Sequence, residues 1–195
     1  MIQEYSCLLF TLPEIDTLAS ELLKSFKTSG AVAFSSPRLV KRIIKNIDFA
    51  HASRIIELGP GNGRITDDLL HLMRKDATLF AFEVNKSFCD DLEKLNDPRL
   101  KVFNESAAHI RAFVGSDTHD GITYIVSSIP FGILPESECD KIMQSIHDIS
   151  DERTTFIQYS YSLIQYRRYK KYFPHLKVQF ELINIPPAFV FVGRQ

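Results

Sequence analysis

The chain has 195 residues, a length that suits one domain large enough to bury a core. Hydrophobic residues make up 45% of it and charged residues 24%, and no stretch approaches the roughly 18–20 apolar residues needed to span a bilayer. The formal net charge of −1 gives no global attraction to nucleic acid. Three distant cysteines and six scattered histidines have no metal-ligand spacing, so we expect reduced thiols in a cytoplasmic protein and no metal site.

We expect a single domain over residues 1–195, with a helical cap at 1–50 and a core at 51–195. Residues 14–27 carry apolar side chains at helical spacing and predict an amphipathic helix, which we expect to cover the functional cleft rather than to insert in a bilayer. A second helix should begin at Ser36, a good N-cap residue, with Pro37 in its first position. Its polar face carries four cations, Arg38, Lys41, Arg42 and Lys45.

From residue 53 onwards, β-branched and aromatic runs alternate with helix-period segments. The strand candidates are 53–59, 78–84, 99–104, 121–128, 154–161, 177–182 and 189–193. The helices expected between them are 64–75, 86–95, 106–114, 136–149 and 163–172. This alternation predicts an α/β fold with three layers around a mostly parallel sheet. Only the short segment 184–188 separates the last two strands, which favours an antiparallel hairpin at the end of the sheet.

The strongest motif is a glycine-rich loop between the first strand and the following helix. It contains Glu57 and the three glycines Gly59, Gly61 and Gly63, and glycines at such a turn let the backbone approach a ligand closely. Arg64 stands where a dinucleotide fingerprint has a third small residue. Glu83 follows the second strand and can accept hydrogen bonds from both hydroxyls of a ribose. The alternative is a plain glycine turn with surface acids.

These residues resemble the class I S-adenosylmethionine-dependent methyltransferases. ELGPGNG at 57–63 is similar to their first motif and FEVN at 82–85 to their second. The resemblance implies a Rossmann-like methyltransferase fold, a seven-stranded sheet with a reversed last strand, and S-adenosylmethionine as the cofactor. It also implies cofactor-binding roles for residues of the glycine loop and of the strand ends. They are Glu57, Gly59, Gly61, Gly63, Glu83, Val84, Glu105, Ser106 and Ser127, with Ser106 where the family usually has an adenine-binding aspartate.

The segment at the end of the fourth strand, Ser127-Ser128-Ile129-Pro130-Phe131, lies where this superfamily binds the methyl acceptor. Methyl transfer is an in-line displacement, so a serine hydroxyl or the strand-end carbonyls could hold the N–H bonds of an amine and aim its lone pair. Pro130 would fix the turn, and Phe131 would pack against the substrate or the methyl group. Tyr159, Tyr161 or solvent could take up the proton that an ammonium must lose. A purely structural turn is the alternative.

Two families share this pattern. The ribosomal RNA adenine dimethyltransferases have Asn-Leu-Pro-Tyr at this position, whereas the bacterial phospholipid (phosphatidylethanolamine) N-methyltransferases have Ser-Gly-Leu-Pro, to which residues 127–130 are more similar. The segments 30–37 and 184–188 also resemble the lipid enzymes. The RNA enzymes carry a helical domain after the sheet, whereas this sequence ends at Gln195.

The primary hypothesis is therefore a methyltransferase acting on the amine of a phospholipid or related aminolipid, cytoplasmic and peripheral on the inner membrane face. The four cations at 38–45 would meet the lipid phosphate, and a second set lies interleaved with aromatics. This second set consists of Arg167, Arg168, Lys170 and Lys171. Either set can equally be an ordinary solvated helix face, and such surfaces also bind RNA. The alternatives are an rRNA adenine N6-methyltransferase and a cofactor-binding relative without catalysis.

Overall fold

The computed structural model describes residues 36–114, 121–184 and 186–195. The expected helix at 14–27 and most of the segment 30–37 lie outside the described residues. Of the expected cap over residues 1–50, only residues 36–50 are described, so the division into cap and core remains a prediction.

The seven expected strands form one sheet in the order β3-β2-β1-β4-β5-β7-β6. Only β7 runs antiparallel to its neighbours, which confirms the reversed hairpin at the end of the sheet. The strands are β1 (Ala52–Leu58), β2 (Thr78–Phe82), β3 (Leu100–Phe103), β4 (Ile122–Ser127), β5 (Thr154–Ser160), β6 (His175–Glu181) and β7 (Ala188–Arg194).

The helices lie between the strands, as the alternation predicts. They are α2 (Pro37–Ile44), α3 (Arg64–Leu72), α4 (Lys86–Glu93), the 3₁₀ turn η1 (Ala107–His109), α5 (Ile110–Val114), α6 (Glu136–Asp148) and α7 (Tyr166–Tyr172). Two starts differ from expectation. Ser106 caps a 3₁₀ turn ahead of α5, and α7 begins three residues late because the hydroxyl of Ser162 accepts a hydrogen bond from the amide of Ile164 at 3.1 Å. Such serine turns compete with helical hydrogen bonding.

The N-terminus of α2 has the expected cap. The hydroxyl of Ser36 accepts a hydrogen bond from the amide of Leu39 at 3.2 Å, and Pro37 occupies the first turn. Leu39 and Ile43 are fully buried, so this helix is fixed to the body by its apolar stripe. Ser36 also donates its own amide to Oδ1 of the buried Asn184 at 3.1 Å, which ties the start of α2 to the loop before β7.

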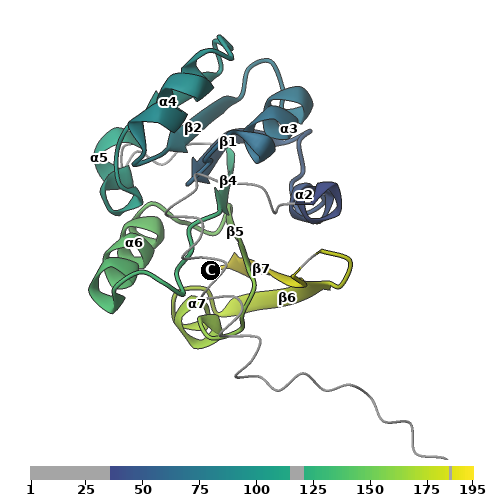
Figure 1. The fold of residues 1–195 in the computed structure, drawn as a ribbon, viewed down its shortest axis with the longest axis vertical. Coiled ribbons are helices and arrows are strands. Elements are labelled where there is room, and N and C mark those ends of the chain that lie inside the picture. The colour runs from purple at the N-terminus through teal and green to yellow at the C-terminus, as the bar shows by residue number, and fades with distance from the viewer. Residues whose placement is uncertain (1–35, 115–120, 185) are drawn as a thin grey trace, which may run out of the picture.

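Successive side chains of each central strand enter two different cores, one on each face of the sheet. Ile55 packs with α2 and α3, whereas Ile56 packs with α5, α6 and α7, and Ile157 and Phe156 divide in the same way. Figure 1 shows these helices placed around the sheet. The result is the three-layer arrangement that the sequence predicts, with both faces of the parallel strands covered.

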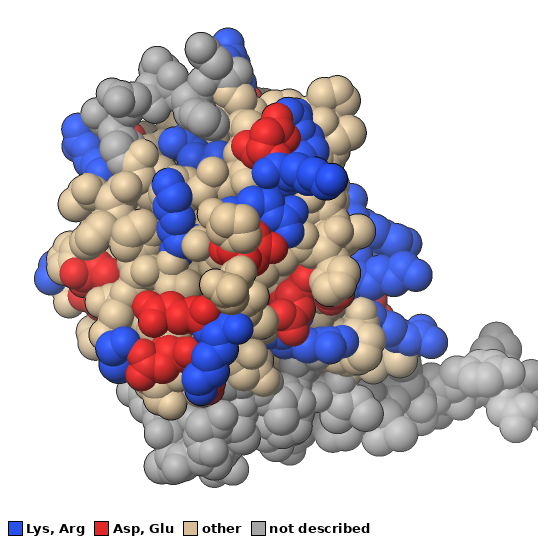
Figure 2. Space-filling model, turned by 90° about the horizontal axis from the view of Figure 1, so that it is seen from above, with Lys and Arg blue, Asp and Glu red and all other residues tan. Residues whose placement is uncertain are grey.

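None of the helices in the described ranges combines the length and the hydropathy that a membrane span requires. The residues in these ranges hold no group of three His, Cys, Asp or Glu side chains that could bind a metal ion. On the face seen in Figure 2, Lys and Arg side chains are largely interspersed with Asp and Glu, rather than gathered into one basic surface.

Candidate active site

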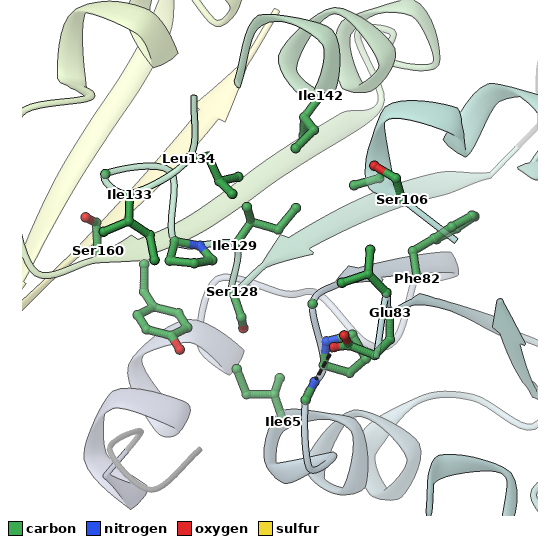
Figure 3. Close-up of a pocket in the computed structure, with 18 of the residues that line it drawn as sticks. Ile65, Phe82, Glu83, Ser106, Ser128, Ile129, Ile133, Leu134, Ile142 and Ser160 are labelled. Atoms are coloured by element: carbon green, nitrogen blue, oxygen red, sulfur yellow. Dashed lines mark hydrogen bonds between the residues drawn. The ribbon is translucent and has the colours of Figure 1, made fainter. Parts of the chain in front are cut away.

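The candidate site lies where the strand order changes direction. β1 and β4 are parallel neighbours with Leu58 opposite Ser127, and the chain continues from β1 towards β2 on one side and from β4 towards β5 on the other. Open α/β sheets bind ligands at the carboxyl ends of the strands at such a point. A cavity of about 420 Å³ opens there, within the usual size of a small-molecule site. In Figure 3, Glu83, Ser128 and Ile65 approach it from three separate segments.

The glycine loop reaches the cavity with its backbone. Gly59, Gly61 and Gly63 all have positive φ, at 69°, 57° and 79°. At Gly63 a Cβ atom would also meet Cδ2 of Leu92 at 2.9 Å, which is closer than atoms can pack. Other residues would therefore strain this turn. Gly59 and Gly61 line the cavity, whereas Gly63 is the N-cap of α3 and does not.

Glu83 fixes the loop from the side of β2. It is only 7% exposed and lines the cavity. Its Oε2 accepts a hydrogen bond from the amide of Gly61 at 3.0 Å, and its Oε1 accepts one from the amide of Asn85 at 2.8 Å. Each carboxylate oxygen can accept a further bond, so Glu83 is held in place and can still receive two ribose hydroxyls.

Glu57 is placed differently from the expected cofactor contact. It is fully buried and does not line the cavity. The hydroxyl of Thr66 donates to Oε2 of Glu57 at 2.7 Å, and Oε1 has no partner among the described residues. Burial raises the pKa of this carboxyl to about 8. Glu57 therefore supports the base of α3 from inside the protein.

The end of the cavity beyond Glu83 is bounded by apolar side chains and two acids. Three of the expected cofactor-binding residues, Val84, Glu105 and Ser106, line this end, and their contact with the cofactor stays a prediction. Phe82 lines it as well, and Val84 is 72% exposed. Two residues of α6, Glu138 and Ile142, join them. Their spacing of four marks one helix face, but no motif in the sequence indicates that this face borders a cavity.

The acceptor segment divides into residues that line the cavity and residues that do not. Ser128, Ile129 and Pro130 line it. Ser127 is fully buried, and its hydroxyl accepts a hydrogen bond from the amide of Ile129 at 3.3 Å. Phe131 is 2% exposed and packs edge-on against Tyr169. The expectations that Ser127 and Phe131 touch a ligand are therefore corrected, because a buried strand end and the core beneath the turn take up their side chains.

The carbonyl of Ile129, two residues beyond the end of β4, is not free to hold an amine. It accepts a hydrogen bond from the amide of Phe131 at 2.9 Å and another from Nε2 of Gln158 at 3.1 Å. Both of its lone pairs are then used. The hydroxyl of Ser128, by contrast, has no hydrogen-bond partner within the described part of the chain. Of the two serine hydroxyls expected at the acceptor, that of Ser128 is the one that remains available.

Tyr159 and Tyr161 both line the cavity, with their rings edge to face at a centroid distance of 6.0 Å. Burial raises the pKa of Tyr161 above its ordinary value. This phenol therefore keeps its proton at neutral pH. It can donate or relay a hydrogen bond, but it cannot serve as a ready-made phenolate base.

Two of the expected basic contacts are engaged inside the protein. Arg42 donates to Glu181 at 2.7 Å. Arg168 pairs with Asp140 at 3.2 Å and also with Glu136. These two arginines fasten α2 to β6 and α7 to α6, because carboxylates lie within reach. Lys41 and Lys45 remain exposed on α2.

An apolar groove beside the cavity was not expected from the sequence. We call it the β6 groove. Its lining consists of Leu163, Ile164, Tyr166, Arg167, Val178, Phe180 and Phe189. Phe180 is 47% exposed and Ile164 is 68% exposed, and Ile164 also lines the main cavity. The alternation of polar and apolar residues over 177–181 predicts a strand. It does not indicate that the short helix α7 leaves one face of that strand, β6, uncovered.

Comparisons with known proteins point to methyl transfer. The family model described as ribosomal RNA adenine dimethylase matches residues 26–174. The ornithine lipid N-methyltransferase of Singulisphaera acidiphila is 25% identical over 171 residues, which cover 85% of this chain and 89% of that protein. The ribosomal RNA small subunit methyltransferase A of Thermotoga maritima is 26% identical over 123 residues, 60% of this chain but only 42% of that protein.

A solved structure supports the fold. The 1,6-didemethyltoxoflavin-N1-methyltransferase of Burkholderia thailandensis, solved with S-adenosylhomocysteine, has a TM-score of 0.62 and 12% identity, covering 97% of this chain and 92% of its own. The cavity fits S-adenosylmethionine, since Glu83 can receive the ribose hydroxyls and the wall at Phe82 and Val84 suits a base. Because the family model spans most of the sequence, the chain belongs to the ribosomal RNA adenine dimethylase family and is an S-adenosylmethionine-dependent methyltransferase.

Proposed function

We propose that this methyltransferase acts on the amine of a phospholipid or related aminolipid at a membrane surface. The relative from Singulisphaera acidiphila, which matches over nearly its whole length, is an ornithine lipid N-methyltransferase, and ornithine lipid is an aminolipid. S-adenosylmethionine supplies an electrophilic methyl group when bound. The chain's own residues must then hold the amine in line and keep water away.

The observation that carries the proposal is the continuity between the cavity and the β6 groove. Ile164 borders both, so an amine at Ser128 and an acyl chain on Phe180 can belong to one molecule. Exposed apolar surface of this kind marks contact with another apolar partner. Arg167 lines the same groove, is exposed, and has no ion pair among the described residues. An acyl chain with an anionic headgroup matches this chemistry.

The acceptor side requires a neutral amine, because an ammonium has no lone pair. In the proposed role, the hydroxyl of Ser128 accepts an N–H bond and orients the lone pair towards the glycine loop. Tyr161, which stays protonated, donates or relays a hydrogen bond near the same place. Solvent takes the proton before the lipid closes the mouth.

The test is methyl transfer from labelled S-adenosylmethionine to three acceptors offered separately: vesicles containing ornithine lipid or phosphatidylethanolamine, small-subunit ribosomal RNA, and free ornithine or ethanolamine. We expect label in the lipid fraction. Vesicles of phosphatidylcholine alone, whose nitrogen is already fully methylated, are the matched control. Label confined to RNA or to the soluble amines would refute the lipid assignment.

The second candidate is an rRNA adenine N6-methyltransferase. The family model and the relative from Thermotoga maritima favour it. RNA binding through phosphate contacts weakens steeply with salt, so this function predicts RNA methylation that disappears as ionic strength rises. The interspersed charges in Figure 2 give that face little of the continuous basic surface that such binding uses.

A further inference from the structure

One end of the cavity must receive the adenine of S-adenosylmethionine. The methyl group has to face the acceptor loop at Ser128, and Glu83 is placed for the ribose, so the base lies beyond Glu83. In Figure 3, Phe82 and Ser106 lie on that side of Glu83, away from Ser160 and Ile133. Apolar walls there suit the faces of a purine, but the exocyclic amine at its edge donates hydrogen bonds and needs an acceptor.

Three side chains with oxygen atoms line this end, and two of them each take part in two hydrogen bonds. Oε1 of Glu105 accepts hydrogen bonds from the amide of Ser106 at 2.8 Å and from Nδ1 of His109 at 3.0 Å. The hydroxyl of Ser106 accepts from the amide of Ala108 at 3.2 Å and donates to Oε1 of Glu138 at 3.3 Å. Both residues therefore serve mainly to build the turn at η1.

Glu138 is the less engaged of the two carboxylates, because its Oε1 accepts one hydrogen bond where that of Glu105 accepts two. It is half-buried and lines the cavity one helical turn from Ile142. Among the described residues, Ser106 is the one hydrogen-bond partner of its carboxylate, and no cation pairs with that carboxylate. The bond to Ser106 positions the carboxylate at the edge of the cavity, and a carboxylate can accept several bonds at once.

We propose that Glu138 accepts the hydrogen bond of the adenine amine and so determines the preference of the site for an adenine base. Ser106 is then a positioning residue that holds Glu138 towards the cavity. This inference concerns the cofactor alone and does not depend on whether the acceptor is a lipid or an RNA.

The test measures binding by calorimetry, without any methyl acceptor. S-adenosylhomocysteine is compared with S-inosylhomocysteine, which carries a carbonyl in place of the amine. We expect the wild-type protein to prefer the adenine compound by roughly tenfold or more, the effect of a hydrogen bond to a charged acceptor. Glu138→Ala should abolish this preference, and Glu138→Gln, which keeps one amide oxygen, should reduce it.

Two controls make the result specific. Glu136→Ala removes the same side chain two residues earlier on α6, outside the cavity, and should leave the preference unchanged. Ser106→Asp in the Glu138→Ala background places a carboxylate on the residue that contacts Glu138 in the wild type. This second change should restore the preference for the adenine compound. A Glu138→Ala protein that still prefers the adenine compound would overturn the proposal, as would loss of the preference in Glu105→Ala alone. Equal thermal unfolding of Glu138→Gln and wild type shows that the fold is kept.

Discussion

At the carboxyl end of β2 a charged carboxylate faces the cavity, whereas the polar side chains that line it from segments 128–130 and 159–162 are uncharged hydroxyls. Glu83 presents its carboxylate oxygens to a ligand, whereas the amides of the three glycines donate inside the protein, to Phe82, Glu83 and Pro60, and so fix the shape of the loop. On the acceptor side, the side-chain amide of Gln158 donates a hydrogen bond to the carbonyl of Ile129, and the neighbouring groove is apolar. In the proposed function, the cofactor is therefore recognised through a fixed polar frame around Glu83, whereas the acceptor is met by uncharged hydroxyls and apolar area.

The buried carboxyl of Glu57 gives the largest expected effect. Its folded-state pKa of about 8 lies above the ordinary value of 4.5, so it stays neutral in the folded chain while the unfolded chain ionises. Its contribution to stability is complete below pH 4.5 and is lost as pH rises towards 8, at a slope of about 1.4 kcal/mol per pH unit.

Glu57→Gln imitates the neutral form and should remove this slope. Denaturant unfolding of both proteins between pH 5 and 8 gives the free energy of unfolding of each, and the pH dependence of their difference measures the slope. The free energy of unfolding of the variant should increase relative to that of the wild type as the pH rises. Parallel pH profiles would show that Glu57 is ionised in the folded protein.

Glu83→Ala would break the polar frame directly. The variant loses the acceptor of the Gly61 amide as well as the proposed ribose contact. We expect S-adenosylhomocysteine to bind roughly 10–100-fold more weakly, because a bond to a charged group contributes about 1.5–3 kcal/mol. Calorimetry measures the loss, and Glu83→Gln should fall between the two. Unchanged affinity would place the ribose elsewhere.

Phe180→Ser with Val178→Ser would break the apolar side. We expect transfer to lipid vesicles to fall by about fivefold, since burial of two half-exposed apolar side chains contributes on the order of 1 kcal/mol. Cofactor affinity should stay at the wild-type value. Leu72→Ser, an exposed apolar residue outside both the cavity and the groove, is the matched control. Equal losses in both proteins would count against a specific lipid contact.

The smallest expected effect concerns Arg42, and it separates a structural ion pair from a membrane contact. Its bond to Glu181 holds the pKa of that carboxyl below its usual range and joins α2 to β6. Arg42→Ala should lower the Tm by a few degrees at most, as expected for a partly exposed pair. Lys41→Ala and Lys45→Ala should leave the Tm unchanged and instead weaken binding to anionic vesicles. The reverse pattern would make Arg42 the membrane contact.

The fold and the cofactor side could be predicted because their signals are local. Glycines at a strand–helix turn and an acid after the second strand specify a geometry within about 30 residues of sequence, and all seven strands were expected. The acceptor side depends on contacts between distant segments. No local pattern shows that Gln158 takes the carbonyl of Ile129, that Phe131 turns into the core, or that Glu138 approaches Ser106 from 32 residues away.

The position of β7 between β5 and β6 has a consequence for synthesis on the ribosome. β6 pairs with β7 and with no other described strand, so it has no place in the sheet until residues 188–194 have been translated. Until then its backbone groups stay unpaired and Val178 and Phe180 are exposed on a free strand, the kind of segment that aggregates. The strand that carries the proposed lipid-binding side chains is therefore the one that a chaperone would be expected to shield.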